Sequence, residues 1–203
     1  MAFFETIETF RSLPSTNDYL KRFLDQGRPR AVRARRQTAG KGQYGRTWHS
    51  ALDQGLYLSM LVFPAWPAAQ ADWLNLAAMA AVLDTLRSQG GPELDLSLKR
   101  PNDILAGGRK LCGILSELSS QQERILWAIV GVGLNLRQRR FPKDLRRPAT
   151  SLLLEGVRSI DDEALASSLL DRFQHYYRQI EDDGGEDLRG RLAAEPSWPA
   201  DPR

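Results

Sequence analysis

A glycine-rich stretch is the first part of this sequence whose residues could do chemistry. Residues 39–48, here called the glycine loop, read AGKGQYGRTW, and Gly40, Gly42 and Gly45 have the Gly-x-Gly-x-x-Gly spacing of a dinucleotide-binding turn. Such a turn opens a helix and is followed by an acidic residue about 20 positions later. Here an apolar, strand-like run over residues 56–63 follows, and no carboxylate stands at the expected place. The P-loop pattern fails too, because its lysine directly follows the last glycine. We therefore predict a loop between strands whose backbone N–H groups can approach an anionic ligand.

The charge around the glycine loop is positive. Every charged residue in the range 26–52 is basic, including Lys41 and Arg46, and Asp53 is the first acid, although the whole chain has a formal net charge of only +3. This excess favours an anionic ligand. A solvated basic surface is the ordinary alternative, and a nucleic-acid surface is a weaker one because the run lacks regularly spaced aromatic residues.

Four further stretches place polar residues or glycines inside otherwise apolar sequence. They are Ser15-Thr16-Asn17, Lys99-Arg100-Pro101-Asn102-Asp103, Lys110-Leu111-Cys112-Gly113-Ile114-Leu115-Ser116-Glu117, and Gly131-Val132-Gly133-Leu134-Asn135. Taken singly, each has a structural explanation: a helix cap, a turn at a strand end formed by Asn102-Asp103, a packing glycine and a tight bend. Their significance depends on which elements bring them together.

Apolar periodicity predicts the elements that must position these residues. A helix follows the cap Ser15 or Thr16 and ends at Gly27, and further helices cover residues 73–87 and 160–180, the last before Gly184-Gly185. Short apolar runs predict strands over residues 31–35, 56–63, 94–98, 111–118 and 125–136, the last two joined by a polar turn at 119–123. Mixed helices and paired strands indicate an α+β fold, a mixed β-sheet flanked by helices.

Length and composition limit the remaining possibilities. With 203 residues and 42% hydrophobic content, the chain can bury one core, and we expect one main domain over residues 1–185 followed by a tail over 186–203 whose last stretch, from Glu195 to Arg203, is loose or laid over the surface. The lone Cys112 cannot form an internal disulfide, which favours a reducing, cytoplasmic compartment. No run is long enough to span a membrane, and the two histidines and one cysteine stand too far apart to suggest a zinc centre or a Cys–His pair.

In their order along the chain, these five stretches resemble the motifs of the biotin protein ligases. That family has a Ser-Thr-Asn element, a Gly-Arg-Gly-Arg-x-Gly-Arg-x-Trp loop, a Lys-Trp-Pro-Asn-Asp turn, a Lys-Leu-x-Gly-Ile-Leu-x-Glu strand and a Gly-x-Gly-x-Asn strand in the same succession. The resemblance implies a catalytic domain of the biotin/lipoate ligase type, similar to class II aminoacyl-tRNA synthetases. It implies that biotin and Mg-ATP give biotinyl-5′-adenylate, and that a lysine of a biotin carboxyl carrier domain then takes the biotinyl group.

The same resemblance implies roles for individual residues. Lys99, Arg46 and Lys41 correspond to the cations that bring anionic substrates together, and Lys99 is expected to matter most. The residues implied for biotin binding are Ser15, Thr16, Asn17, Gln37, Gly40, Lys41, Gly42, Gln43, Lys99, Gly113 and Gly131. Those implied for ATP or the adenylate are Gly45, Arg46, Trp48, Asn102, Asp103 and Asn135. Asp103 could instead polarise the carrier lysine or contact Mg²⁺, and the magnesium ligands are not determined.

Three positions depart from the family pattern. Lys41 and Gln43 replace the first and second arginine of the loop, and Arg100 replaces a tryptophan. The loss of charge at Gln43 predicts weaker retention of the adenylate. Too few residues precede Ser15 for a DNA-binding domain, so DNA binding is not expected, and no run of strands follows Gly185 that would form the family's C-terminal β-barrel. A non-catalytic biotin- or adenylate-binding protein and a lipoate or octanoate ligase remain alternatives, and the strand over 125–136 could pair across a homodimer.

Overall fold

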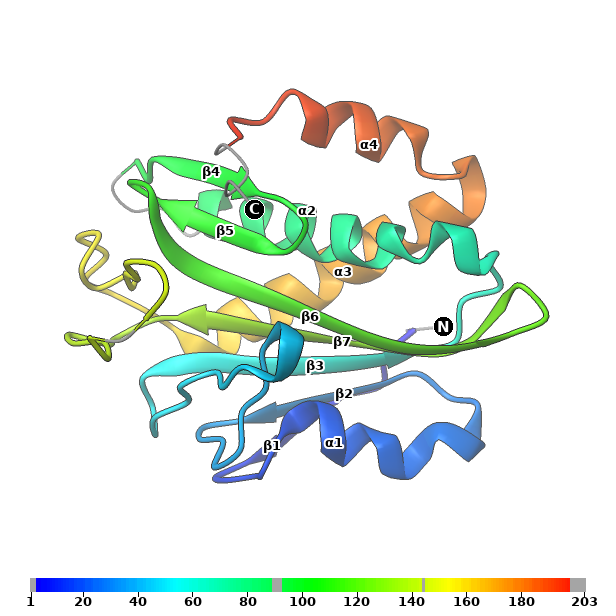
Figure 1. The fold of residues 1–203 in the computed structure, drawn as a ribbon, viewed down its shortest axis with the longest axis horizontal. Coiled ribbons are helices and arrows are strands. Elements are labelled where there is room, and N and C mark those ends of the chain that lie inside the picture. Colours follow the sequence, from blue (N-terminus) through cyan, green and yellow to red (C-terminus); the bar gives the residue numbers. More distant parts are fainter. Residues whose placement is uncertain (1–2, 89–92, 144, 198–203) are drawn as a thin grey trace.

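A seven-stranded mixed β-sheet organises the chain (Figure 1). The computed structural model describes residues 3–88, 93–143 and 145–197. The strand order is β1-β2-β3-β7-β6-β5-β4, in which β1 and β2 are parallel and the other neighbours are antiparallel. The strands are β1 (Ile7–Phe10), β2 (Arg30–Ala34), β3 (Gly55–Val62), β4 (Leu96–Lys99), β5 (Asp103–Ala106), β6 (Arg109–Gln121) and β7 (Arg124–Asn135). This architecture confirms the predicted α+β class.

Helices α2 (Asp72–Ser88) and α3 (Asp162–Asp183) cover one face of the sheet. Helix α2 is buried along most of its length, and α3 begins at the N-cap Asp161, whose carboxylate accepts from two backbone N–H groups. Their side chains and one face of the strands form the main core. The opposite face carries α1 (Thr16–Leu20) and a smaller apolar cluster around Leu20, Val32, Leu61 and Ile129. The central strand β3 is therefore buried on both sides, as its continuous apolar sequence predicted.

The predicted helices and five strands are confirmed, with shifts of a few residues at their ends. The turn predicted over residues 119–123 is shorter, because β6 and β7 pair as far as Gln121 and Arg124 and leave Gln122 and Glu123 as the loop. Both loop residues have positive φ, 48° and 63°, the conformation that a tight two-residue hairpin demands. Motif reasoning missed β1 and β5, which are short. The turn placed at Asn102-Asp103 was also wrong in part, because Asp103 already begins β5 and pairs with Lys99 of β4.

The segment expected to form a C-terminal tail contains structure. Helix α4 (Glu186–Ala193) buries Leu188 and Leu192 and packs against α2 and α3. Beyond it, both Glu195 oxygens accept from the Arg87 guanidinium at 2.7 and 2.6 Å, and the Leu98 N–H donates to the Pro196 carbonyl at 2.7 Å. Residues 195–197 are thus laid over the surface, one of the two arrangements expected for the last stretch, and residues 198–203 lie outside the described part. Within the described ranges, no helix has the length and apolar character needed to cross a membrane.

Candidate active site

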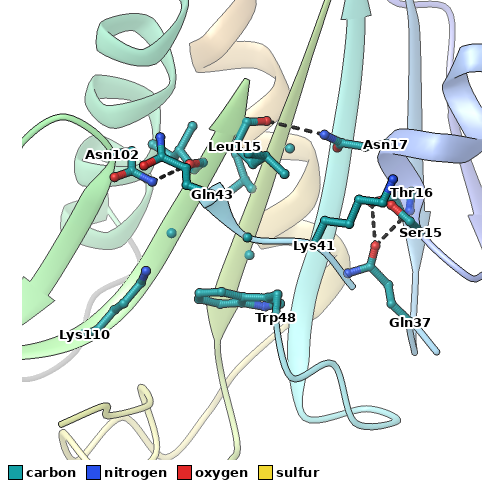
Figure 2. Close-up of a pocket in the computed structure, with 16 residues that line it drawn as sticks. Ser15, Thr16, Asn17, Gln37, Lys41, Gln43, Trp48, Asn102, Lys110 and Leu115 are labelled. Carbon is teal, nitrogen blue, oxygen red and sulfur yellow. Dashed lines mark hydrogen bonds between the residues drawn. The ribbon is translucent and has the colours of Figure 1, made fainter. Parts of the chain in front are cut away.

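A pocket opens on the face of the sheet opposite α2 and α3, between the start of α1, the glycine loop and the strands β6 and β7 (Figure 2). It contains roughly 470 Å³ of empty space, part of it open to solvent. Its lining consists of Ser15, Thr16, Asn17, Gln37, Lys41, Gly42, Gln43, Trp48, Asn102, Lys110, Gly113, Ile114, Leu115, Gly131, Val132 and Gly133. All five motif stretches contribute to it, although they lie far apart in the sequence.

The pocket is polar where α1 begins. Thr16 donates from its backbone N and its Oγ1 to Gln37 Oε1, at 2.8 and 3.0 Å (Figure 2). Gln37 Nε2 donates in turn to Ser50 Oγ at 3.0 Å, which fixes the orientation of the amide. Ser59 is fully buried in β3, and its Oγ lies 2.7 Å from Thr16 Oγ1. Motif reasoning missed Ser59, although the one serine within the apolar run 56–63 is a detectable signal.

Asn17 connects α1 to the sheet above a glycine. Its Nδ2 donates to Glu117 Oε2 at 2.8 Å, and its Oδ1 lies 2.6 Å from Ser59 Oγ. A Cβ atom at Gly131 would lie only 2.4 Å from Asn17 Oδ1, so the glycine is needed for this approach. The space above Gly131 is therefore filled by the protein's own side chain, and Asn17 forms part of the polar floor of the pocket.

The Trp48 side chain packs closely against two other glycines. Gly113 of β6 and Gly133 of β7 are register partners, and a Cβ at these positions would lie 2.8 and 2.5 Å from the Trp48 indole. The indole thus rests on bare backbone and forms an apolar wall beside Lys110, whose Nζ is 5.2 Å from the ring centroid. Gly113, which the resemblance implies for biotin binding, lines the pocket and is also contacted by Trp48.

This packing predicts the effect of adding one methyl group. Gly133→Ala should force the Trp48 ring to move and lower the free energy of unfolding by about 1–3 kcal/mol, the usual effect of overpacking. The measurement is urea unfolding of both proteins. Gly190→Ala is the matched control, because Gly190 lies inside α4 and a Cβ there meets nothing within 4 Å. The control should be unchanged or up to about 1 kcal/mol more stable. Equal stability of Gly133→Ala and wild type would contradict the packing described for Trp48.

The glycine loop is a small hairpin. The Gly42 N–H donates to the Arg46 carbonyl at 2.7 Å, and the Trp48 N–H donates to the Gly40 carbonyl at 2.9 Å. Its tip is Gln43–Gly45, where Tyr44 and Gly45 have φ values of 58° and 72°. Of the loop residues assigned to ligand binding, Lys41, Gly42, Gln43 and Trp48 line the pocket, whereas Gly40, Gly45 and Arg46 do not.

The three loop residues outside the lining have other surroundings. Gly40 makes room for the Trp48 carbonyl and Ser50 Oγ, which would lie 2.5 and 2.7 Å from a Cβ at that position. Gly45 provides the left-handed conformation at the loop tip. The exposed Arg46 donates from Nε to the Gln43 carbonyl at 3.0 Å, and its guanidinium lies over the Tyr44 ring.

Two lysines line the pocket, and each has a carboxylate partner outside the lining. Lys41 Nζ lies 2.7 Å from Asp18 Oδ1, and Lys110 Nζ lies 2.7 Å from Asp103 Oδ1. Lys110 begins the motif stretch over residues 110–117, but the sequence did not predict it as a site residue. The ammonium of Lys110 reaches the pocket, and the pairing of β5 with β6 brings Asp103 beside this lysine. Asp103 does not line the pocket itself, but it holds Lys110 in place.

Lys99 and Asn135 do not line the pocket. Lys99 ends β4, and burial lowers its pKa below the ordinary lysine value, with further lowering by Arg147, Arg146 and Arg46 and an opposing effect of Asp103. Asn135 is buried, and its amide donates to the Thr150 carbonyl at 2.9 Å. It therefore fastens the segment after β7 in this structure. Asn102 does line the pocket, where its Nδ2 donates to the Ile114 carbonyl at 2.8 Å.

Part of the basic run over residues 26–52 is paired with acids. Arg30 pairs with Glu8 at 2.9 Å and Arg35 with Asp53 at 2.5 Å, both away from the pocket. Of the cations in this run, only Lys41 lines the pocket. In the described ranges, no group of three or more His, Cys, Asp or Glu residues could hold a metal ion.

Comparisons with known proteins agree with this arrangement. The sequence profile of the Biotin/lipoate A/B protein ligase family matches residues 9–135. The biotin--[acetyl-CoA-carboxylase] ligase of Mycobacterium tuberculosis is 41% identical over 139 residues, which are 68% of this chain and 50% of that protein. The bifunctional ligase/repressor BirA of Bacillus spizizenii is 36% identical over 149 residues, covering 72% of this chain and 45% of that protein. The chain thus spans about half the length of the curated relatives it matches.

A solved structure agrees in fold as well. The biotin protein ligase from Aquifex aeolicus in complex with biotin and ATP superposes with a TM-score of 0.77 and 26% sequence identity, covering 95% of this chain and 78% of that one. The similarity extends beyond the profile match, because it includes the segments that form α3 and α4.

Proposed function

The chain belongs to the biotin/lipoate A/B protein ligase family, and from this premise we propose that it activates biotin as biotinyl-5′-adenylate and transfers the biotinyl group to a carrier lysine. A biotin carboxylate oxygen attacks the α-phosphorus of ATP, and the bond from that phosphorus to the bridging oxygen breaks to release pyrophosphate. The carrier amine, after losing its proton, then attacks the acyl carbon, and AMP leaves. Neither step needs a covalent protein nucleophile, which suits a pocket without a Ser–His or Cys–His pair among its lining residues.

The observation that carries the proposal is that one pocket presents polar groups at one end and two lysines at its rim. The ureido ring of biotin requires both donors and acceptors, and Ser15, Thr16 and Gln37 offer hydroxyl and amide groups fixed by their own hydrogen bonds. Trp48 and the strand residues beside it supply the apolar surface that a thioether ring and alkyl chain need. Lipoate has no ureido group, so this polar end favours biotin.

The lysines address the repulsion between two anionic substrates. The biotin carboxylate and the ATP phosphates repel until cations lie between them, and Lys41 and Lys110 are positioned to do this. Arg46, at the exposed end of the glycine loop, and Lys99, at the end of β4, lie outside the lining in this structure and would contact the nucleotide when it is bound. The glycine loop lying over the bound adenylate would also protect it from hydrolysis.

Magnesium fits this site as a companion of ATP. Mg²⁺ is usually bound through substrate phosphates, waters and one or two carboxylates, and the described residues offer no group of three or more acidic, His or Cys ligands. Asp103 is the carboxylate at the pocket edge, held by Lys110, and is the residue that would contact such an ion. Bound there, the ion would neutralise phosphate charge.

The deciding experiment is incubation of the purified chain with biotin and Mg-ATP, with lipoate in parallel, followed by mass spectrometry for the acyl-adenylate. Biotinyl-adenylate is the expected product, and a purified carboxyl carrier domain added next should gain one biotinyl group. Lipoyl-adenylate alone would indicate the lipoate ligase activity instead. Biotin binding measured by calorimetry without any adenylate would indicate a non-catalytic binding protein.

Gln43 gives a prediction about the intermediate. It lines the pocket without charge, so Gln43→Arg should add a cation beside the adenylate phosphate and lower the amount of free biotinyl-adenylate released into solution by about tenfold, a modest charge-assisted contact of about 1.4 kcal/mol. Released adenylate is measured by filtration and mass spectrometry. Gln121→Arg, an equivalent change at the exposed end of β6, is the control and should leave release unchanged. An unchanged release from Gln43→Arg would show that position 43 does not govern retention.

A further inference from the structure

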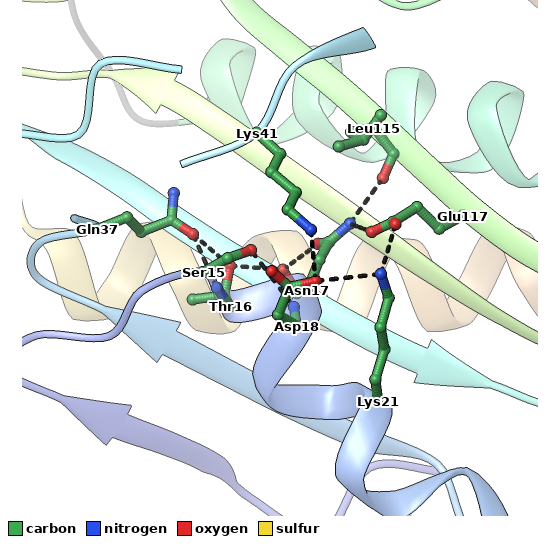
Figure 3. A network of polar contacts seen from close by, with 10 residues as sticks. Ser15, Thr16, Asn17, Asp18, Lys21, Gln37, Lys41, Leu115 and Glu117 are labelled. Atoms are coloured by element: carbon green, nitrogen blue, oxygen red, sulfur yellow. Dashed lines mark hydrogen bonds and ion pairs between the residues drawn. The ribbon is translucent and has the colours of Figure 1, made fainter. Parts of the chain in front are cut away.

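Lys41 is held by a residue that the family comparison and the motifs do not assign to the site. Its Nζ lies 2.7 Å from Asp18 Oδ1, and this contact joins the glycine loop to the first turn of α1 (Figure 3). In the described part of the chain, this is the polar side-chain contact that joins residues 41–46 to a residue outside the loop, since the Arg46 Nε bond stays within it. The tip is otherwise exposed, with Tyr44 88% accessible to solvent. The base of the loop is held by the Ala39 N–H bond to the Pro14 carbonyl and by Trp48, whereas the Lys41–Asp18 pair is the contact that holds the part nearer the tip.

Asp18 is itself fixed from the other side. Lys21 Nζ lies 3.1 Å from the same Oδ1 and 2.7 Å from Glu117 Oε1, and Glu117 Oε2 accepts from Asn17 Nδ2 at 2.8 Å (Figure 3). Although partial burial by itself raises the pKa of Asp18, the hydrogen bonds from Lys41 and Lys21 lower it below the usual aspartate value. The carboxylate is thus charged at neutral pH and is anchored to both α1 and β6.

We propose that Asp18 is a positioning residue that latches the glycine loop over the pocket by holding Lys41. The inference rests on the proposed function, because the loop would retain the adenylate only if the pocket binds it. Asp18 does not line the pocket, so it acts through Lys41 and not on the substrate. This anchor holds the charge of Lys41 at the pocket rim. Gln43, close to it in the loop, carries no charge.

The size of the effect is limited by solvent. The Lys41 and Asp18 side chains are 44% and 37% exposed, and ion pairs of this kind contribute little because water screens them. We therefore expect that breaking the pair increases opening of the loop by about two- to fivefold. A change of this size alters retention of a bound intermediate without unfolding the protein.

Limited proteolysis tests the latch without requiring any enzymatic activity. Trypsin cleaves after Arg46, which lies in the loop, and the rate at this site is followed by mass spectrometry without ligand. Asp18→Asn should raise the rate about two- to fivefold, whereas Asp18→Glu, which keeps the charge, should stay near the wild-type rate. Asp53→Asn is the matched control, since it removes a similar ion pair, with Arg35, away from the pocket. It should leave the cleavage rate unchanged.

A double variant separates the latch from a general effect of charge on α1. If Asp18 acts through Lys41, Asp18→Asn should add nothing to the cleavage rate of Lys41→Met. An additional increase in the double variant, or an unchanged rate in Asp18→Asn, would overturn the proposal. Unfolding midpoints measured in urea identify any variant that cleaves faster only because it is less stable. Release of biotinyl-adenylate should rise in the same order, and a chain that makes no adenylate would refute the proposed function while the proteolysis still reports on the latch.

Discussion

Replacing Lys110 with methionine is expected to lower the rate of biotinyl-adenylate formation by about 10²- to 10³-fold, the usual effect of removing a preorganised charge-stabilising group. Lys110 lines the pocket, and its ammonium is fixed between Asp103 and the Trp48 ring. A methionine keeps the apolar stem but removes the cation that faces the reacting carboxylate and phosphate. The rate is measured as pyrophosphate release in single turnover at saturating ATP, and biotin affinity is measured separately by calorimetry.

Two control variants test whether the lower rate results from the loss of the lysine charge. Lys110→Met alone removes the lysine partner of the nearly buried Asp103 carboxylate, which should destabilise the protein. The double variant Lys110→Met with Asp103→Asn removes the carboxylate charge as well. The double variant should regain stability and remain slow. Lys143→Met removes an exposed lysine away from the pocket and should keep the wild-type rate. A folded Lys110→Met variant with a rate within threefold of wild type would contradict the role given to Lys110.

Lys99→Met is expected to have a similarly large effect on adenylate formation, about 10²- to 10³-fold, with much less effect on biotin binding. In the family motif, the lysine at this position lies where the biotin carboxylate meets the ATP phosphate. In this structure Lys99 lies outside the pocket lining, on β4, which pairs with the strand that carries Asp103. Biotin can therefore occupy the pocket without touching Lys99, whereas the bound nucleotide would meet it. Calorimetry with biotin should thus show an affinity close to wild type.

The pH dependence offers an independent test of Lys99. A lysine must be protonated to neutralise phosphate, so adenylate formation should decline as pH rises through the pKa of Lys99. Because burial and nearby arginines lower this pKa, the decline should begin at a lower pH than an ordinary lysine would give. The Lys99→Met variant should lack this limb of the profile. Equal losses of biotin affinity and rate in Lys99→Met would instead place Lys99 in the biotin site.

Local sequence was enough to predict most of the longer elements of the fold and part of the composition of the pocket. Ser15 caps α1, Gly27 and Gly184 end helical segments with positive φ, and the apolar run of β3 is buried on both faces. These outcomes depend on interactions between residues close in the chain or on a burial pattern visible within one segment. Thr16, Gln37 and Asn102, which the sequence predicted as site residues, line one pocket.

Only the tertiary structure decided which of these residues face the pocket and which hold other residues in place. Lys110 reaches the pocket while Lys99 and Asn135 do not, because strand pairing and side-chain alternation fix the direction of each residue. Gly113 and Gly133 face one another in register, and this pairing leaves the bare surface on which Trp48 packs. The Lys41–Asp18 pair likewise joins residues 23 positions apart. Such contacts depend on the folded path of the whole chain, so no local pattern of residues could have determined them.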